Sequence, residues 1–211
     1  MLLRVRVALP DRPGSLAQVT RALGTAGADI TQVTVLDRGA GTAVDDITVF
    51  CPESVPRQAL VKSLETVDDV RVESVWSTRE AAGTYPELEI LKYITTAGER
   101  ALTTLVDSLP VLFSADWAAT AADQGILYAS WRTPQGLVMP APAPPRPAAL
   151  TLDDGVHAIH APLPPLALTL LLARSEGPAF HRTEVHRLTR ILEIFLSLPA
   201  TERSIARQLR A

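Results

Sequence analysis

The residues best placed to bind a small molecule lie in one stretch near the amino terminus, Asp11-Arg12-Pro13-Gly14-Ser15-Leu16. Pro and Gly in this order are typical of a tight turn, and Gly14 lets a ligand approach the backbone closely because it has no Cβ. Ser15 and Gln18 have the spacing of a capping box, which predicts that a helix begins at Ser15. The amides and the positive dipole end at the start of this helix would favour a carboxylate.

The helix after the turn is expected to end at Gly27, since glycine readily takes the left-handed conformation that stops a helix. Asp29 and Ile30 follow and open the next predicted strand. A carboxylate such as that of Asp11 or Asp29 only accepts hydrogen bonds, so it favours an ammonium group and repels an acid. Together with the helix start, these residues favour a site for a zwitterion; the alternative is that Asp11-Arg12-Pro13-Gly14 is only a well-formed turn.

Asp11-Arg12-Pro13-Gly14-Ser15-Leu16, followed by Gly27-Ala28-Asp29-Ile30, resembles the ACT domain, a small amino-acid-binding regulatory module attached to many enzymes of amino-acid metabolism. The resemblance covers Leu2 to about Trp76 and implies a βαββαβ ferredoxin-like fold. It also implies that two domains pair, with the ligand between the first turn of one and the second strand of the other. Position 29 is often Asn in members that bind an amino acid, whereas it is Asp in this chain. Matched residue by residue, the resemblance assigns ligand contacts to Asp11, Pro13, Gly14, Ser15, Leu16, Asp29 and Ile30.

Periodicity in the first 76 residues predicts the elements that position this turn. Apolar residues alternate from Leu3 to Leu9, which indicates a first strand with one covered face and one wet face. The pattern continues with strands at 30–36 and 46–51, a helix at 56–66 and a strand at 70–76. Two helices over one sheet face make a small two-layer domain, so pairing through its bare sheet surface or edges is expected.

The second half of the chain predicts a separate α+β domain at 87–199, after a linker at 77–86 and before a tail at 200–211. A helical pattern runs from 88 to 109 with Gly98 on its apolar stripe, and Pro110 is expected to end it. Strands are expected at 117–123, 125–131, 155–161 and 166–174, and an amphipathic helix at 183–198. The proline-rich stretch 139–147 is expected to leave the sheet as an extended, solvated loop.

The stretch from Leu170 to Phe180 contains Gly177-Pro178 and leads into a predicted helix. Together, this stretch and the helix resemble the end of a GAF domain. That family has a central antiparallel sheet with flanking helices and serves small-ligand sensing or dimerisation. The proline-rich stretch stands where such domains usually place pocket-lining segments. The overall expectation is therefore an α+β chain, an ACT-like domain followed by a GAF-like one, with no cofactor.

The residue types and their spacing give little indication of a catalytic or metal-binding site. His157 and His160 would point to opposite faces of a strand, and a phosphate loop, nucleophile elbow or His-Glu metal motif does not occur. Asp153-Asp154 precedes a glycine, which is typical of a solvated turn, and His181 with His186 has no better metal spacing. Cys51 ends an alternating strand and is expected to be a buried small hydrophobe.

Composition narrows the class of protein further. The formal net charge of −3, without a basic run interleaved with aromatics, favours no nucleic-acid partner. The most apolar stretch, 165–173, is too short to span a bilayer, and the early arginines do not fit a signal peptide, so a cytoplasmic location is expected. Heavy use of arginine, alanine and proline suggests a GC-rich bacterial genome.

The sequence therefore predicts a non-enzymatic regulatory protein that binds an amino acid and acts as a homodimer. One alternative is an interaction scaffold or regulatory subunit whose domains only dimerise or dock onto an enzyme. A second alternative is an enzyme that uses the second half of the chain.

Overall fold

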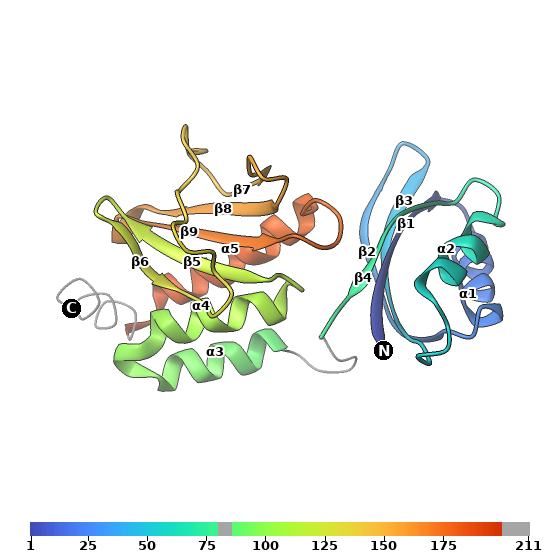
Figure 1. Ribbon diagram of the computed structural model, residues 1–211, viewed down its shortest axis with the longest axis horizontal. Coiled ribbons are helices and arrows are strands. Elements are labelled where there is room, and N and C mark those ends of the chain that lie inside the picture. The colour runs from blue at the N-terminus through green and yellow to red at the C-terminus, as the bar shows by residue number, and fades with distance from the viewer. Residues whose placement is uncertain (80–85, 200–211) are drawn as a thin grey trace. The chain divides into compact units, whose positions relative to one another are not determined.

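The computed structural model describes residues 1–79 and 86–199, which form two compact units (Figure 1). The first unit comprises residues 1–79 together with Glu176–Pro178, and the second comprises residues 86–175 and 179–199. Most of the predicted linker and the whole predicted tail lie outside the described residues. Within the described ranges, no helix combines the length and the apolar character needed to cross a membrane.

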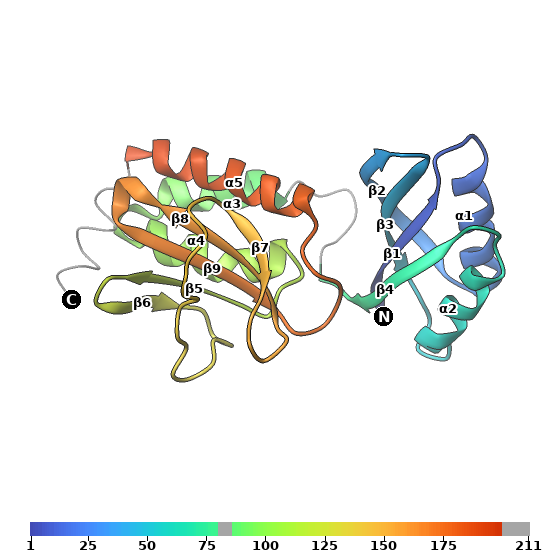
Figure 2. The ribbon, with the colours of Figure 1, turned by 90° about the horizontal axis from the view of Figure 1, so that it is seen from above.

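The first unit has the βαββαβ order that the sequence predicts. Its antiparallel sheet has the strand order β2-β3-β1-β4, and both helices cover the same face of that sheet (Figures 1 and 2). The apolar side of β1 packs against α1 and α2, and Val5, Leu23 and Leu60 are fully buried in this core. The elements are β1 (Leu2–Pro10), α1 (Ser15–Thr25), β2 (Asp29–Gly39), β3 (Thr42–Phe50), α2 (Arg57–Glu65) and β4 (Arg71–Ser77).

The predicted wet face of β1 is wrong, because its polar residues are buried as well. The Arg6 residue is 1% exposed, and its guanidinium donates to both carboxylate oxygens of Asp46 on β3, over 2.7 and 2.8 Å. The register places these two residues directly opposite each other. A fork-to-fork ion pair allows both charges to be buried together, which a rule based on alternating polarity does not anticipate.

The two ends of α1 differ in how well the sequence predicts them. The predicted capping box at Ser15 is wrong: the N-cap is Gly14 with φ of 91°, no side chain caps the helix, and Ser15 is its first residue. At the other end, Gly27 has φ of 86°, its amide donates to Gly24 O, and the Ala28 amide donates to Leu23 O. This is a Schellman motif, so the predicted helix stop is confirmed.

The second unit is an open five-stranded antiparallel sheet in the order β6-β5-β9-β8-β7. Helices α4 and α5 pack on one face, and α3 lies against both of them (Figure 2). The GAF resemblance of this unit stays a prediction. Its elements are α3 (Pro86–Thr96), a 3-10 turn (Gly98–Arg100), α4 (Ala101–Leu112), β5 (Trp117–Ala122), β6 (Gly125–Ala129), β7 (Ala148–Thr151), β8 (His157–Leu163), a 3-10 turn (Pro164–Leu166), β9 (Leu168–Arg174) and α5 (Arg182–Ser197).

Two features of the second unit differ from the sequence prediction. The single helix predicted for 88–109 is broken, because Gly98 has φ of 57° and separates α3 from α4. Pro110 lies inside the last turn of α4 rather than ending the run. The short strand β7 was missed, since it follows the proline-rich stretch without any extended alternation of its own.

A buried ion pair also anchors the second unit. Arg174 at the end of β9 donates to both carboxylate oxygens of Glu184 on α5, over 3.0 and 3.1 Å. Glu184 Oε2 also accepts from the His181 amide at 2.8 Å, which completes a capping box at the start of α5. The Phe180 ring stacks against the Arg174 guanidinium, 3.8 Å from the ring centroid. One carboxylate thus fixes the helix start to the sheet.

Candidate binding site at the turn between β1 and α1

A pocket of about 350 Å³ lies beside the turn that joins β1 to α1. We call it the turn pocket. This volume lies at the low end of the range for small-molecule sites, so it suits a ligand of the size of an amino acid. Its lining residues come from the end of β1, the turn, the start of α1, the end of β2 and the start of β3: Leu9, Pro10, Asp11, Arg12, Pro13, Gly14, Ser15, Leu16, Val35, Arg38, Ala43 and Asp45.

The backbone of the turn offers fewer amides than the sequence suggests. The amides of Asp11, Arg12 and Ser15 already donate to carbonyls within the unit, over 2.9, 2.9 and 3.3 Å. The amides of Gly14 and Leu16 have no hydrogen-bond acceptor among the described residues. Because both residues line the turn pocket at the start of α1, their amides are the ones that a carboxylate could meet.

The rim of the turn pocket carries one ion pair. Arg38 near the end of β2 donates to Asp11 Oδ1 from Nε and Nη2, over 3.0 and 2.6 Å. Asp11 also donates from its amide to Gly41 O at 2.9 Å, which ties the turn to the hairpin between β2 and β3. The hydrogen bond and charge of Asp11 raise the pKa of Arg38, so the guanidinium stays charged. The rim therefore presents a cation and an anion side by side.

A second carboxylate, that of Asp45 on β3, lines the same pocket. Asp45 shares its strand face with Ala43 and Ile47, so it points toward the helices rather than toward Arg6. The residue is 2% exposed, and its Oδ1 has no hydrogen-bond partner among the described residues. Burial, and then the neighbouring charge of Asp46, raise the pKa of the Asp45 carboxyl above its ordinary value.

The seven residues assigned from the sequence fall in two places. Asp11, Pro13, Gly14, Ser15 and Leu16 all line the turn pocket, whereas Asp29 and Ile30 open β2 and do not. The six steps along β2 from Asp29 to Val35 correspond to about 20 Å of strand, so one chain cannot bring Asp29 to its own pocket. Within a single chain, the structure therefore gathers five of these seven residues.

Three charged pocket residues, Arg12, Arg38 and Asp45, are not among the seven residues assigned from the sequence. Arg38 lies beyond the strand predicted for 30–36, yet β2 continues to Gly39 and brings this side chain beside Asp11. Asp45 did leave a signal, because it shares its parity with the apolar Ile47 and Val49 in an alternating strand. An acid in that position is out of keeping with its neighbours, which is how functional positions often appear.

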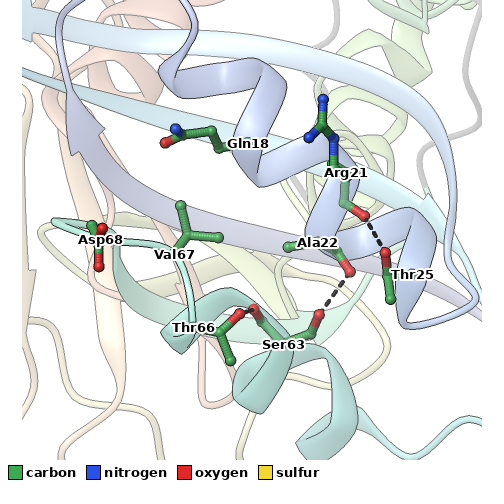
Figure 3. A pocket seen from close by; sticks show the side chains of 8 residues that line it. All are labelled: Gln18, Arg21, Ala22, Thr25, Ser63, Thr66, Val67 and Asp68. Carbon is green, nitrogen blue, oxygen red and sulfur yellow. Dashed lines mark hydrogen bonds between the residues drawn. The ribbon is translucent and has the colours of Figure 1, made fainter.

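A second hollow of about 340 Å³ lies between α1 and α2 (Figure 3). Its hydroxyl groups are already occupied: Ser63 donates to Ala22 O at 2.7 Å, Thr25 to Arg21 O at 2.9 Å, and Thr66 to Ser63 O at 2.7 Å. These bonds, drawn in Figure 3, link the two helices or close a helix turn. This hollow is therefore a weaker candidate than the turn pocket.

The second unit has its own hollow, of about 720 Å³, between the proline-rich stretch and the segment 150–154. Leu137 and Met139 from this part of the chain pack on the sheet face opposite the helices, beside Trp117 and Leu171. The stretch thus leaves the sheet as predicted, but part of it covers the sheet instead of lying free in solvent. Among the described residues, no group of three or more His, Cys, Asp or Glu side chains has the arrangement of a metal site.

Comparison with known protein families now decides the nature of the first unit, since residues 3–69 match the ACT domain. The first unit is an ACT domain. The match agrees with the βαββαβ order and with the position of the turn pocket after the first strand. Membership in this class supports a regulatory, ligand-binding role for the unit.

No curated protein matches the chain. Among solved structures, a formyltetrahydrofolate deformylase from Pseudomonas putida KT2440 is 17% identical, with 46% of this chain and 39% of that chain covered and a TM-score of 0.30. An unknown protein from Galdieria sulphuraria is 13% identical, with 91% of both chains covered and a TM-score of 0.30. The ligand-free regulatory subunit of aspartate kinase from Thermus thermophilus is also 13% identical, with 94% and 92% covered and a TM-score of 0.30. Likeness at this level assigns no function.

Proposed function

We propose that this chain is a non-enzymatic regulatory protein whose ACT domain binds an amino acid in the turn pocket. The observation that carries the proposal is the pairing of opposite charges around one small cavity. Unbonded amides of Gly14 and Leu16 suit a carboxylate, and the carboxylate of Asp45 suits an ammonium group. A free amino acid carries both groups on adjacent atoms, so it matches this arrangement better than a simple acid does.

We further propose that a second copy of the chain completes the ligand-binding site. Asp29 and Ile30 lie at the far end of β2 from their own turn pocket, so only a second copy could bring them to it. In such a homodimer, ligand binding would strengthen the contact between the two copies. Sedimentation of the full chain with and without its amino acid tests this point: the proposal expects tighter self-association with ligand, and an unchanged monomer contradicts it.

The Asp11–Arg38 ion pair favours one competing function, an interaction scaffold that binds no ligand. In that case the charges at the rim would simply neutralise each other and close the turn. A thermal-shift screen of the full chain against the standard amino acids separates the two functions. A ligand at a hundred times its dissociation constant stabilises the folded state by about 2.7 kcal/mol. The regulatory function expects a shift with one or a few amino acids, and the scaffold expects none.

The choice of variant matters for locating such a shift. Gly14 has φ of 91°, so any side chain at this position strains the turn even though a Cβ would meet no atom within 4 Å. A loss of binding in a Gly14 variant could therefore reflect a distorted turn. Val35 is the better position, because it lines the turn pocket and is already 50% exposed on β2.

A further inference from the structure

Asp45 occupies a position that the fold alone does not explain. The strand register sets it between Val7 of β1 and Val35 of β2, and its neighbours on the same face of β3, Ala43 and Ile47, belong to the apolar core. A carboxylate removed from water costs several kcal/mol unless a partner compensates it. A residue with this cost and no structural benefit is a candidate for function.

The charges around Asp45 do not compensate its carboxylate, so a cation would stabilise the ionised form. The acids that act on it are Asp46 and Asp11, and the charge of each disfavours the ionised form of Asp45. Arg38 acts in the opposite direction, but its hydrogen bonds go to Asp11 rather than to Asp45. Asp45 Oδ1 thus remains a buried acceptor without a donor among the described residues, in a residue that lines the turn pocket.

We propose that Asp45 receives the ammonium group of the ligand and thereby restricts the turn pocket to primary ammonium compounds. This inference rests on the proposed function and adds a residue from β3, outside the turn and the second strand, which sets the class of ligand. An ammonium group brings three donors and a full positive charge to a site that holds an unpaired acceptor. The ligand carboxylate then lies at the start of α1, against the amides of Gly14 and Leu16.

The first arm of the test varies the ligand and leaves the protein intact. Each amino acid that shifts the melting temperature of the full chain is compared with its 2-hydroxy acid, in which a hydroxyl replaces the ammonium group. Loss of a charge-assisted hydrogen bond should weaken binding roughly tenfold to hundredfold. Equal binding of the hydroxy acid overturns the proposal while leaving the proposed function intact.

The second arm replaces the carboxylate by its neutral isostere, Asp45→Asn. The ligand-free variant should melt at a higher temperature than the wild type, because a buried charge is removed, yet its ligand affinity should fall by the same tenfold to hundredfold. Glu53→Gln, a loss of one exposed charge in the same unit, is the matched control and should alter neither property. An Asp45→Asn variant that binds as tightly as the wild type overturns the proposal.

The third arm separates this inference from the proposed function. Ethanolamine, putrescine and agmatine carry primary ammonium or guanidinium groups without a carboxylate, and magnesium and calcium chloride supply inorganic cations. A shift with the amines alone that disappears in Asp45→Asn supports the role of Asp45 and contradicts amino-acid binding. A shift with the inorganic cations, and with no amino acid or amine, overturns the proposal.

Discussion

Arg38 donates two hydrogen bonds to a single carboxylate oxygen of Asp11, and this ion pair joins the end of β2 to the turn before α1. The Arg38 side chain is 67% exposed, so water and salt screen the attraction and the pair adds little to the stability of the unit. Both residues line the turn pocket. The pair is therefore better suited to meet a ligand than to hold the fold.

Replacing Arg38 by Met should weaken ligand binding but leave the melting temperature of the free protein nearly unchanged. Methionine keeps an apolar stem of similar length and removes only the charge beside Asp11. Arg71→Met is the matched control, because Arg71 also forms an exposed ion pair, with Glu73 at 2.9 Å, and does not line the pocket. Calorimetric titration of both variants with the amino acid measures their affinities. Equal affinities of Arg38→Met and Arg71→Met would show that Arg38 does not take part in binding.

The stability difference between Asp45→Asn and the wild type should depend on pH with a defined sign. The pKa of Asp45 is raised in the folded protein above its ordinary 3.8, so the folded state binds the proton more tightly than the unfolded state. The free energy of unfolding of the wild type then falls as pH rises from the ordinary pKa of the carboxyl through its raised pKa in the folded protein. The reason is that unfolding releases the carboxyl from burial, so its ionisation favours the unfolded state. The variant lacks this cost at neutral pH.

Urea unfolding of both proteins from pH 7 down toward pH 4 measures that difference. The advantage of Asp45→Asn should be largest at pH 7 and shrink as the wild-type carboxyl becomes protonated. A difference that is constant with pH, or that grows on acidification, would mean that burial does not raise the pKa of Asp45.

Breaking the Arg6–Asp46 ion pair should strongly destabilise the ACT domain. Asp46→Asn removes the carboxylate that pairs with an almost wholly buried guanidinium, and such changes cost about 3–5 kcal/mol. The double variant Arg6→Met with Asp46→Leu should recover much of this loss, because both members of the buried ion pair are then removed. Urea unfolding monitored by circular dichroism tests both; a loss below about 1 kcal/mol in the single variant would show that water reaches Arg6.

Glu184→Gln should destabilise the second unit by about 3 kcal/mol, because Arg174 then loses the carboxylate to which it donates two hydrogen bonds, while the side chain at the start of α5 keeps its size. Glu193→Gln, in the exposed pair with Arg190 at 2.8 Å on the same helix, is the control and should change stability by less than about 0.5 kcal/mol. Similar losses of stability in the two variants would show that the buried ion pair contributes no more than the exposed one.

The sequence predicted the parts of the fold that depend on local pattern. The Pro13-Gly14 turn, the helix stop at Gly27 and the strand parity that separates Asp46 from Ile47 all follow from residue types a few positions apart. The same reasoning failed at Ser15, because Gly14 took the N-cap position with a positive φ. It also failed at Gly98, where one glycine divides two helices that share an uninterrupted apolar stripe.

Two of the charged residues of the turn pocket could not be predicted from the sequence, for a different reason. Arg38 and Asp45 meet the turn only because β2 and β3 form a hairpin whose end folds back onto Asp11. That register is set by the pairing of three strands, and no spacing along the chain encodes it. The inward parity of Asp45 was readable, but without the cavity beside it this acid resembled an ordinary strand residue.

The central claim, that the turn pocket binds an amino acid, is tested most directly by calorimetric titration of two matched variants. Val35→Phe fills the pocket, whereas Val33→Phe adds the same ring on the same strand, at an exposed position that does not line it. The account predicts that the wild type and Val33→Phe bind the amino acid found in the screen with equal affinity, and that Val35→Phe does not bind it. Undiminished binding by Val35→Phe would place the ligand elsewhere and contradict the account.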